Sequence, residues 1–126
     1  MKIRIKGNTL RFRLTQSEVN YFTEHGNLEE NTQFGSGTLI YSIQSSKTES
    51  ILKATFNNNK ICLFVPEAEA KRWTQTNLVG LQNEQDTGND KKLFLLLEKD
   101  FKCLDETNED QSDNYPNPLA EKHQNG

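Results

Sequence analysis

The chain has few of the residues on which enzyme and metal sites are usually built. Its 126 residues include two cysteines, Cys62 and Cys103, and two histidines, His25 and His123. Two cysteines are too few for the disulfide framework of a small secreted protein, and they lack the paired spacing of a zinc site. There is also no glycine-rich phosphate loop and no nucleophile with a neighbouring base. The sequence therefore indicates no cofactor and no catalytic residue.

Long hydrophobic runs are missing as well. No stretch approaches the roughly 18 apolar residues of a membrane-spanning helix, and the N-terminus alternates charged and apolar residues where a secretion signal would be uniformly apolar. The formal net charge is −3, which disfavours bulk affinity for nucleic acid. We expect a cytoplasmic protein that has no membrane contact, with nucleic acid a disfavoured partner.

Two strands and a helix are predicted at the start of the chain. Apolar and basic residues alternate over residues 2–6 and again over residues 9–14, which is the period of a half-buried strand. Gly7-Asn8 between them favours a tight hairpin turn. Thr15 and Glu18 have the spacing of a capping box, which predicts a helix over residues 16–25 that ends at a left-handed Gly26.

The same design returns 51 residues later. Residues 51–57 and 60–65 read as a second hairpin with an Asn58-Asn59 turn, and a helix is expected from Pro66 to about Gln75. At this offset the apolar positions correspond. The pairs are Ile5 with Phe56, Leu10 with Ile61, Phe12 with Leu63, Leu14 with Val65, and Phe22 with Trp73. Any two units of this type share some of this pattern, so chance similarity is the alternative explanation.

The predicted fold is α+β, built from two fused ββαββ repeats with pseudo-two-fold symmetry. Further strands are expected over residues 28–34, 38–44, 78–85 and 92–98. The eight strands, mostly antiparallel, would form a barrel or a strongly twisted sheet with two helices. We favour the barrel, because closure removes exposed sheet edges.

One domain is predicted over residues 1–104, with repeats at about 1–50 and 51–99. Residues 105–126 form an acidic, proline-containing C-terminal segment with little apolar content, so we expect its end to be disordered.

Two stretches carry a resemblance to a known family. They are the opening MKIRIKGNTLRFRLTQSEV and the later CLDETNEDQSDNYPNP. With these, the chain resembles a family of small bacterial proteins, mostly from Bacteroidota, that forms a domain of unknown function of the DUF7009 type. The resemblance covers roughly residues 1–119 and implies a bacterial cytoplasmic domain, without implying a catalytic residue.

The outward face of the first hairpin is predicted to be basic. Its residues are Lys2, Arg4, Lys6, Arg11 and Arg13, and no acid precedes Glu18. The corresponding residues of the second hairpin are Lys53, Thr55, Asn57, Cys62 and Phe64. The fold therefore does not require this charge. The face is a candidate for binding an anion or nucleic acid, for contacting carboxylates of the chain itself or of a partner, or for simple solvation.

The acidic segment at residues 105–113 is a candidate metal site. Asp105, Glu109, Asp110 and Asp113 could supply oxygen ligands to a hard cation, but they do not follow the order of an EF-hand loop. A solvated acidic loop is the simpler interpretation. A third possibility is that the segment lies along the basic hairpin, with Arg11 or Arg13 paired to one of the acids.

The function most consistent with these features is that of a small non-catalytic binding domain. It would take a protein partner or a small ligand, and the sequence leaves its oligomeric state open. The alternatives are a metal-binding or enzymatic protein that uses residues 105–113, and an anion- or nucleic-acid-binding protein that uses the first hairpin.

Overall fold

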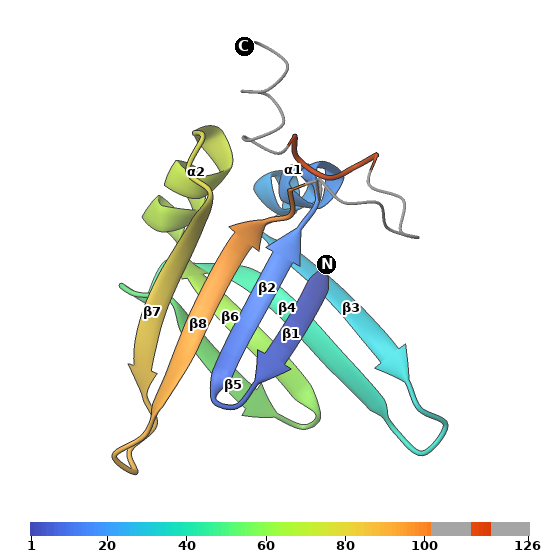
Figure 1. Cartoon of the computed structure of the whole chain (residues 1–126), viewed down its shortest axis with the longest axis vertical. Helices are drawn as coiled ribbons and strands as arrows, with labels where there is room; N and C mark the ends of the chain where they lie inside the picture. The colour runs from blue at the N-terminus through green and yellow to red at the C-terminus, as the bar shows by residue number, and fades with distance from the viewer. Residues whose placement is uncertain (102–111, 117–126) are drawn as a thin grey trace.

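The computed structural model describes residues 1–101 and 112–116. These residues form eight strands and two helices (Figure 1). The strands are β1 (Lys2–Lys6), β2 (Thr9–Leu14), β3 (Asn27–Gln33), β4 (Thr38–Ser46), β5 (Lys53–Asn57), β6 (Lys60–Pro66), β7 (Gly80–Asp86) and β8 (Lys92–Lys99). The helices are α1 (Gln16–His25) and α2 (Glu67–Gln75). Every predicted element is present, and no bound differs from its prediction by more than two residues.

The strands form two four-stranded sheets. The first sheet has the order β1-β2-β8-β7, and the second has the order β3-β4-β6-β5. Each sheet combines two antiparallel hairpins, one from each half of the chain, and the hairpins meet in a parallel pair. In the first sheet β2 runs parallel to β8, with Leu10 opposite Leu95. In the second sheet β4 runs parallel to β6, with Ile43 opposite Leu63.

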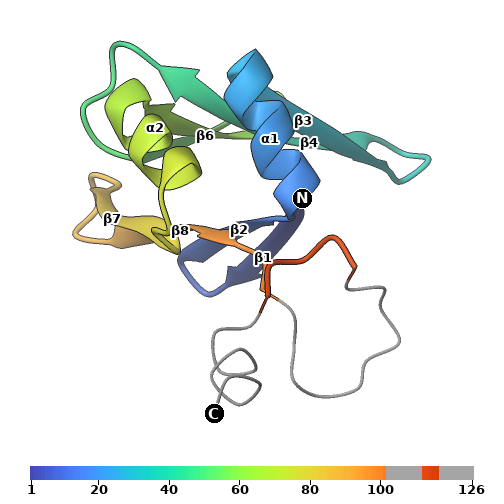
Figure 2. The ribbon, with the colours of Figure 1, turned by 90° about the horizontal axis from the view of Figure 1, so that it is seen from above.

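Both helices lie between the two sheets at one end of the molecule (Figure 2). Their buried residues are Val19 and Phe22 of α1 and Ala70 and Trp73 of α2. The rings of Phe22 and Trp73 meet at a centroid distance of 6.5 Å, and the Trp73 indole donates a hydrogen bond of 3.0 Å to the Val79 carbonyl. The helices therefore contribute aromatic side chains to the core that the sheets enclose.

Local sequence signals explain how the elements begin and end. Gly7 turns the first hairpin with a φ of 53°, and both turn residues of the second hairpin, Asn58 and Asn59, also have positive φ. The capping box of α1 is formed, with the Thr15 amide donating to Glu18 Oε1 over 2.9 Å. Gly26 ends that helix at a φ of 74°, in the left-handed region that glycine tolerates best.

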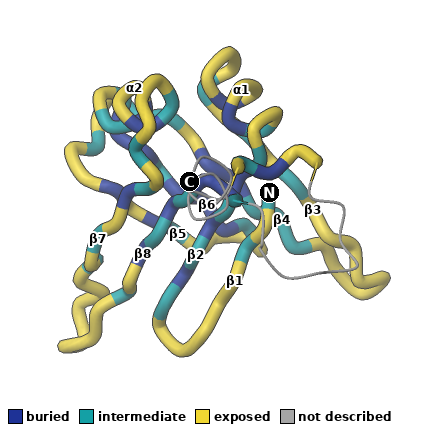
Figure 3. The backbone as a smooth tube through the Cα atoms, turned by 45° about the horizontal axis from the view of Figure 1, so that its top comes forward, coloured by how far each residue is buried: buried dark blue, intermediate teal, exposed yellow. Residues whose placement is uncertain are grey.

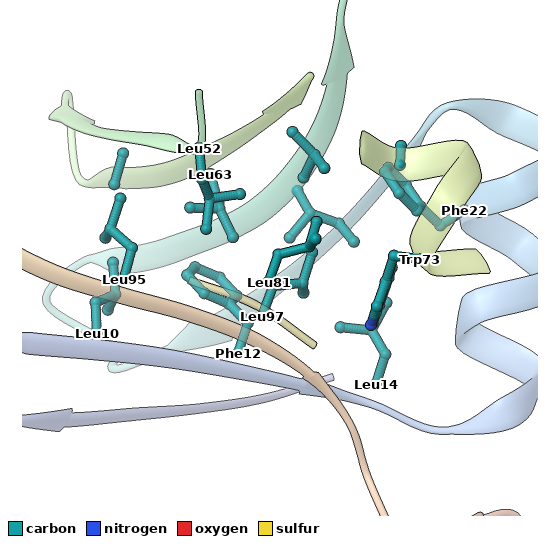
Figure 4. Packing of buried hydrophobic residues seen from close by; sticks show 14 of the residues in the cluster. Leu10, Phe12, Leu14, Phe22, Leu52, Leu63, Trp73, Leu81, Leu95 and Leu97 are labelled. Atoms are coloured by element: carbon teal, nitrogen blue, oxygen red, sulfur yellow. The ribbon is translucent and has the colours of Figure 1, made fainter. Parts of the chain in front are cut away.

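The core lies between the inner faces of the sheets and extends up to the helices. In Figure 4, Leu10 and Leu95 of the first sheet lie opposite Leu52 and Leu63, and Trp73 lies towards the helix end. Buried segments concentrate along the inner faces of the strands and helices, whereas the hairpin tips are exposed (Figure 3). The two-residue alternation of the strands therefore divides each sheet into a buried and a solvent-facing side.

The expectation of a barrel is wrong. Within residues 1–101 and 112–116, no strand ladder joins one sheet to the other, so both sheets remain open. The prediction rested on the cost of exposed edges, but in the structure side chains form hydrogen bonds with backbone groups at these edges. Gln85 of β7 forms two hydrogen bonds with the backbone of Ala54 in β5, at 2.7 and 2.9 Å, and Asn83 donates to the Leu52 carbonyl at 2.8 Å. These side-chain amides therefore satisfy backbone groups at the sheet edge that would otherwise be paired by a neighbouring strand.

The opposite side of the sandwich is joined through the N-terminal ammonium group. This group contacts Glu30 of β3 at 2.9 Å and also pairs with Glu18 of α1. It therefore links the start of β1 in the first sheet to the edge strand of the second.

Replacing Trp73 tests the role of the helix end in stability. Trp73→Ala removes a fully buried ring that contacts Phe22, so we expect a loss of about 3–5 kcal/mol in the free energy of unfolding. Urea titration followed by circular dichroism measures this change. Phe34, 66% exposed, provides the control, since Phe34→Ala should leave the midpoint nearly unchanged. An unchanged midpoint for the Trp73 variant would contradict the packing described.

A second substitution tests the contact between the sheets. Gln85→Leu removes both hydrogen bonds to Ala54 and leaves edge groups of β5 unpaired, which should cost about 1–3 kcal/mol. Gln82→Leu, on the exposed side of the same strand, is the matched control. Thermal unfolding of the two variants compares them directly. Equal melting temperatures would show that the amide bridge does not support the open edge.

Candidate functional site

The predicted basic residues lie together on the outward face of β1 and β2. The register places Lys2 opposite Arg13, Arg4 opposite Arg11, and Lys6 opposite Thr9. The intervening residues of β2, Leu10, Phe12 and Leu14, are buried on the other side. Two of the cross-strand pairs therefore join like charges, an arrangement that destabilises a hairpin. We call these five basic residues the basic face.

The fold itself neutralises part of the basic face. Arg11 Nε lies 2.9 Å from Glu98 Oε1, at an angle unsuited to a hydrogen bond, and Lys2 Nζ lies 3.2 Å from the buried Asp100. The other three basic residues, Arg4, Lys6 and Arg13, form no ion pair with any residue that the structure describes. Their charges therefore face solvent without a carboxylate from the described residues.

An apolar strip borders the basic face. Phe94 and Leu96 of β8 stand in register with Thr9 and Arg11, and Phe94 is 44% exposed although its strand is central. The strand is central, but its outward side remains partly exposed. A shallow hollow of about 180 Å³ lies between Arg4, Lys6, Thr9 and Arg11.

The described part of the C-terminal segment, residues 112–116, returns to the start of α1. Asp113 accepts hydrogen bonds from the Ser17 amide at 3.2 Å and from the Ser17 hydroxyl at 2.5 Å, and its carbonyl accepts the Gln16 amide at 3.0 Å. The Tyr115 amide donates to the Asp100 carbonyl at 2.7 Å. Asp113 thus satisfies amides that the first turn of a helix leaves unpaired, and the Ser17 hydroxyl bond lowers the pKa of its carboxyl group most.

This placement bears on the predictions for the acidic segment. Asp113, a candidate metal ligand, acts in the structure as a helix cap. The other candidates, Asp105, Glu109 and Asp110, lie outside the described residues, and so do their expected pairings with the basic face. Among the described residues, no group of three or more histidine, cysteine or acidic side chains is placed to hold a metal ion.

Two functional candidates were missed from the sequence, namely Lys99 at the end of β8 and Tyr115 in the returning segment. Both line a cleft of about 530 Å³ between α1, α2 and residues 115–116. Lys99 continues the series of inward-facing residues Leu95 and Leu97. The two-residue alternation of the strand was therefore the signal in the sequence that could have identified it. Nothing local predicted that Tyr115 would return to this point. Of the other residues considered, His25 lies against Tyr21 with the rings tilted and their centroids 4.1 Å apart, and Cys62 is a buried free thiol. Cys103 and His123 lie outside the described residues.

Comparison with known proteins gives one match. The model of the family of unknown function DUF7009 matches residues 1–119. The chain belongs to this family. Searches of the curated proteins and of the solved structures found no match.

The extent of the DUF7009 match adds to the description of the site. It includes the residues that return to α1, Asp113 and Tyr115, together with both sheets. The returning segment is therefore part of the family's domain. No helix among the described residues of this DUF7009 protein has the length and apolarity to cross a membrane.

Asp113 predicts a pH dependence of stability. Because its pKa is lowered in the folded state, its stabilising contribution is present above the unfolded-state pKa and is lost as the pH falls through the folded-state pKa. Asp113→Asn should therefore unfold more easily than the parent protein at neutral pH, and the difference should disappear in strong acid. Thermal unfolding at a series of pH values measures this. Asp90→Asn, in the β7–β8 loop, is the control, and a difference independent of pH would rule out the charged cap.

Proposed function

We propose that this protein is a non-catalytic binding domain that uses its basic face to hold an acidic segment of a protein partner. The observation that carries the proposal is the pair of like-charge contacts across β1 and β2, Lys2 with Arg13 and Arg4 with Arg11. Such pairs lower the stability of the hairpin. Binding to another molecule accounts for the presence of these pairs better than a role in stabilising the fold does.

The strands in the second half of the chain support this interpretation. We infer that the chain is a duplicated ββαββ unit with pseudo-two-fold symmetry, because β5-β6-β4-β3 repeats the order β1-β2-β8-β7 with the halves exchanged. In that correspondence the hairpin β5–β6 forms a sheet of the same kind with Thr55 and Cys62 where β1–β2 has Arg4 and Arg11. The fold is therefore compatible with a hairpin that lacks the paired arginines at this position.

The neighbours of the basic face indicate the chemistry of the partner. Glu98 and Asp100 already contact Arg11 and Lys2, so carboxylates fit this surface. The exposed Phe94, further along β8 and in register with Thr9, can accept an apolar side chain. We therefore infer a partner segment that combines several acids with an apolar residue. Nucleic acid is a poorer fit, since the chain has a net charge of −3 and Glu84 stands in register with Phe94. The bacterial origin and the cytoplasmic location expected from the sequence stay predictions.

The double variant Arg4→Gln/Arg13→Gln tests the proposal. These arginines form no ion pair with the described residues, so their loss should leave the fold intact and relieve repulsion. We expect affinity for a fluorescent glutamate-rich peptide containing one phenylalanine to fall at least about tenfold, the equivalent of about 1.4 kcal/mol. Fluorescence anisotropy at two salt concentrations measures it, and binding to the parent protein should weaken with salt.

The control is Lys71→Gln, which removes one exposed charge from α2. Equal binding by the parent protein and the double variant would contradict the role of the basic face. A loss of affinity in the control as large as that in the double variant would contradict it as well. Preferential binding of a single-stranded oligonucleotide over the acidic peptide would replace the protein partner with nucleic acid.

A further inference from the structure

The cleft at the helix end has the dimensions of a ligand site and lies apart from the basic face. Its volume of about 530 Å³ falls within the range of roughly 300–1,000 Å³ typical of small-molecule pockets. Its lining combines polar side chains from both helices and their ends with aromatic residues. The lining residues used below are Asn20, Thr76, Asn77, Lys99, Phe101 and Tyr115.

Lys99 is the distinctive group in this cleft. The residue is 7% exposed, and its ammonium group donates a hydrogen bond of 2.7 Å to the Thr76 carbonyl at the end of α2. The ring of Tyr115 lies 5.6 Å from the same nitrogen, in a cation–π contact. No carboxylate among the described residues forms an ion pair with Lys99. Burial consequently lowers the pKa of the ammonium group.

The contacts of Lys99 leave donor capacity for a ligand. An ammonium group has three protons, of which the bond to Thr76 uses one, and the aromatic contact supplies no formal negative charge. Buried charges in proteins are normally paired, because removing an ion from water is costly. A cation in this position is therefore suited to an anion that enters the cleft from solvent.

The aromatic wall indicates the rest of the ligand. Phe101 and Tyr115 pack together at a centroid distance of 5.6 Å, and their backbones form an isolated bridge. Burial raises the pKa of the Tyr115 phenol, and the charge of Asp113 adds to this effect, so the phenol stays neutral and can donate a hydrogen bond. The amide side chains of Asn20 and Asn77 supply further donors and acceptors at the rim.

We propose that this cleft binds a small carboxylate with an aromatic or apolar body, whose carboxylate pairs with Lys99 and whose body packs on Phe101 and Tyr115. Because one wall belongs to residues 115–116, an occupied cleft also holds the returning segment against α1. The site uses no residue of the basic face, so the two proposals stand or fall separately.

Phenylacetate and phenylacetamide form a matched pair of probes for the full-length protein. They share the aromatic body, and only the first has a negative charge. We expect phenylacetate to shift the amide resonances of Asn20, Thr76 and Tyr115 in a saturable way in heteronuclear NMR spectra and to slow hydrogen exchange at Tyr115. Phenylacetamide should bind at least about tenfold more weakly.

Substitutions at Lys99 connect these effects to the cleft. Lys99→Met should abolish the preference for phenylacetate over phenylacetamide, whereas Lys99→Arg, which keeps the charge, should retain it. Lys71→Met, which removes an exposed lysine of α2, should behave like the parent protein. If Lys99→Met fails to fold, Lys99→Arg and Tyr115→Ala still provide the test, because loss of the Tyr115 ring should weaken phenylacetate binding in a protein that retains Lys99.

Three results would overturn the proposal. One is the absence of saturable shifts with millimolar phenylacetate. Another is equal binding of the acid and the amide by the parent protein. The third is a preference for the acid that persists in a folded Lys99→Met variant.

Discussion

The parallel pairing of β2 with β8 is the constraint on which the rest of the molecule depends. It joins the second strand of the chain to the last, so that Leu14 stands opposite Lys99 and the Asp100 amide bonds to the Leu14 carbonyl at 2.8 Å. The equivalent pairing of β4 with β6 forms the second sheet. Because β8 ends at the helices, its last residues enter the cleft. Because β8 adjoins β2, its outward apolar residues border the basic face.

The helices explain why the sheets remain open. A helix with its side chains is about 10 Å across, which is also the usual distance between packed sheets. Two helices between the sheets at one end therefore hold the layers apart there, and Phe22 and Trp73 fill the space (Figures 2 and 4). Closure into a barrel would require edge strands to meet across this gap. Side-chain bonds such as those of Gln85 cross it instead.

Charge is distributed according to two different needs. On the basic face, like charges stand opposite one another at the surface, where their repulsion weakens the hairpin and decreases with salt. In the cleft, a single cation is withdrawn from water and receives only a carbonyl group and an aromatic ring. The first arrangement suits an extended partner with several charges. The second suits a single charge on a small ligand, since a low local dielectric strengthens one well-placed pair.

The sequence by itself determined the local structure and the composition of the surfaces. The turn at Gly7, the cap formed by Thr15 and Glu18, and the two-residue alternation of β2 depend on interactions within a few residues, and all three are confirmed. In β1 the expected alternation of burial is not seen, because Ile5 is 62% exposed. The basic face followed from the same alternation. Backbone preferences and side-chain direction are short-range properties, so a single sequence expresses them directly.

Only the tertiary structure decided which hairpins join in one sheet, whether the sheets close, and where the chain returns. Asp113 could be read from the sequence as a metal ligand, and it became a helix cap because residues 112–116 reach α1. Lys99 has its proposed role in binding because β8 places it beneath the end of α2, next to Tyr115. These positions follow from the joint burial of apolar surface by segments far apart in the chain, an energy that belongs to the packed molecule as a whole.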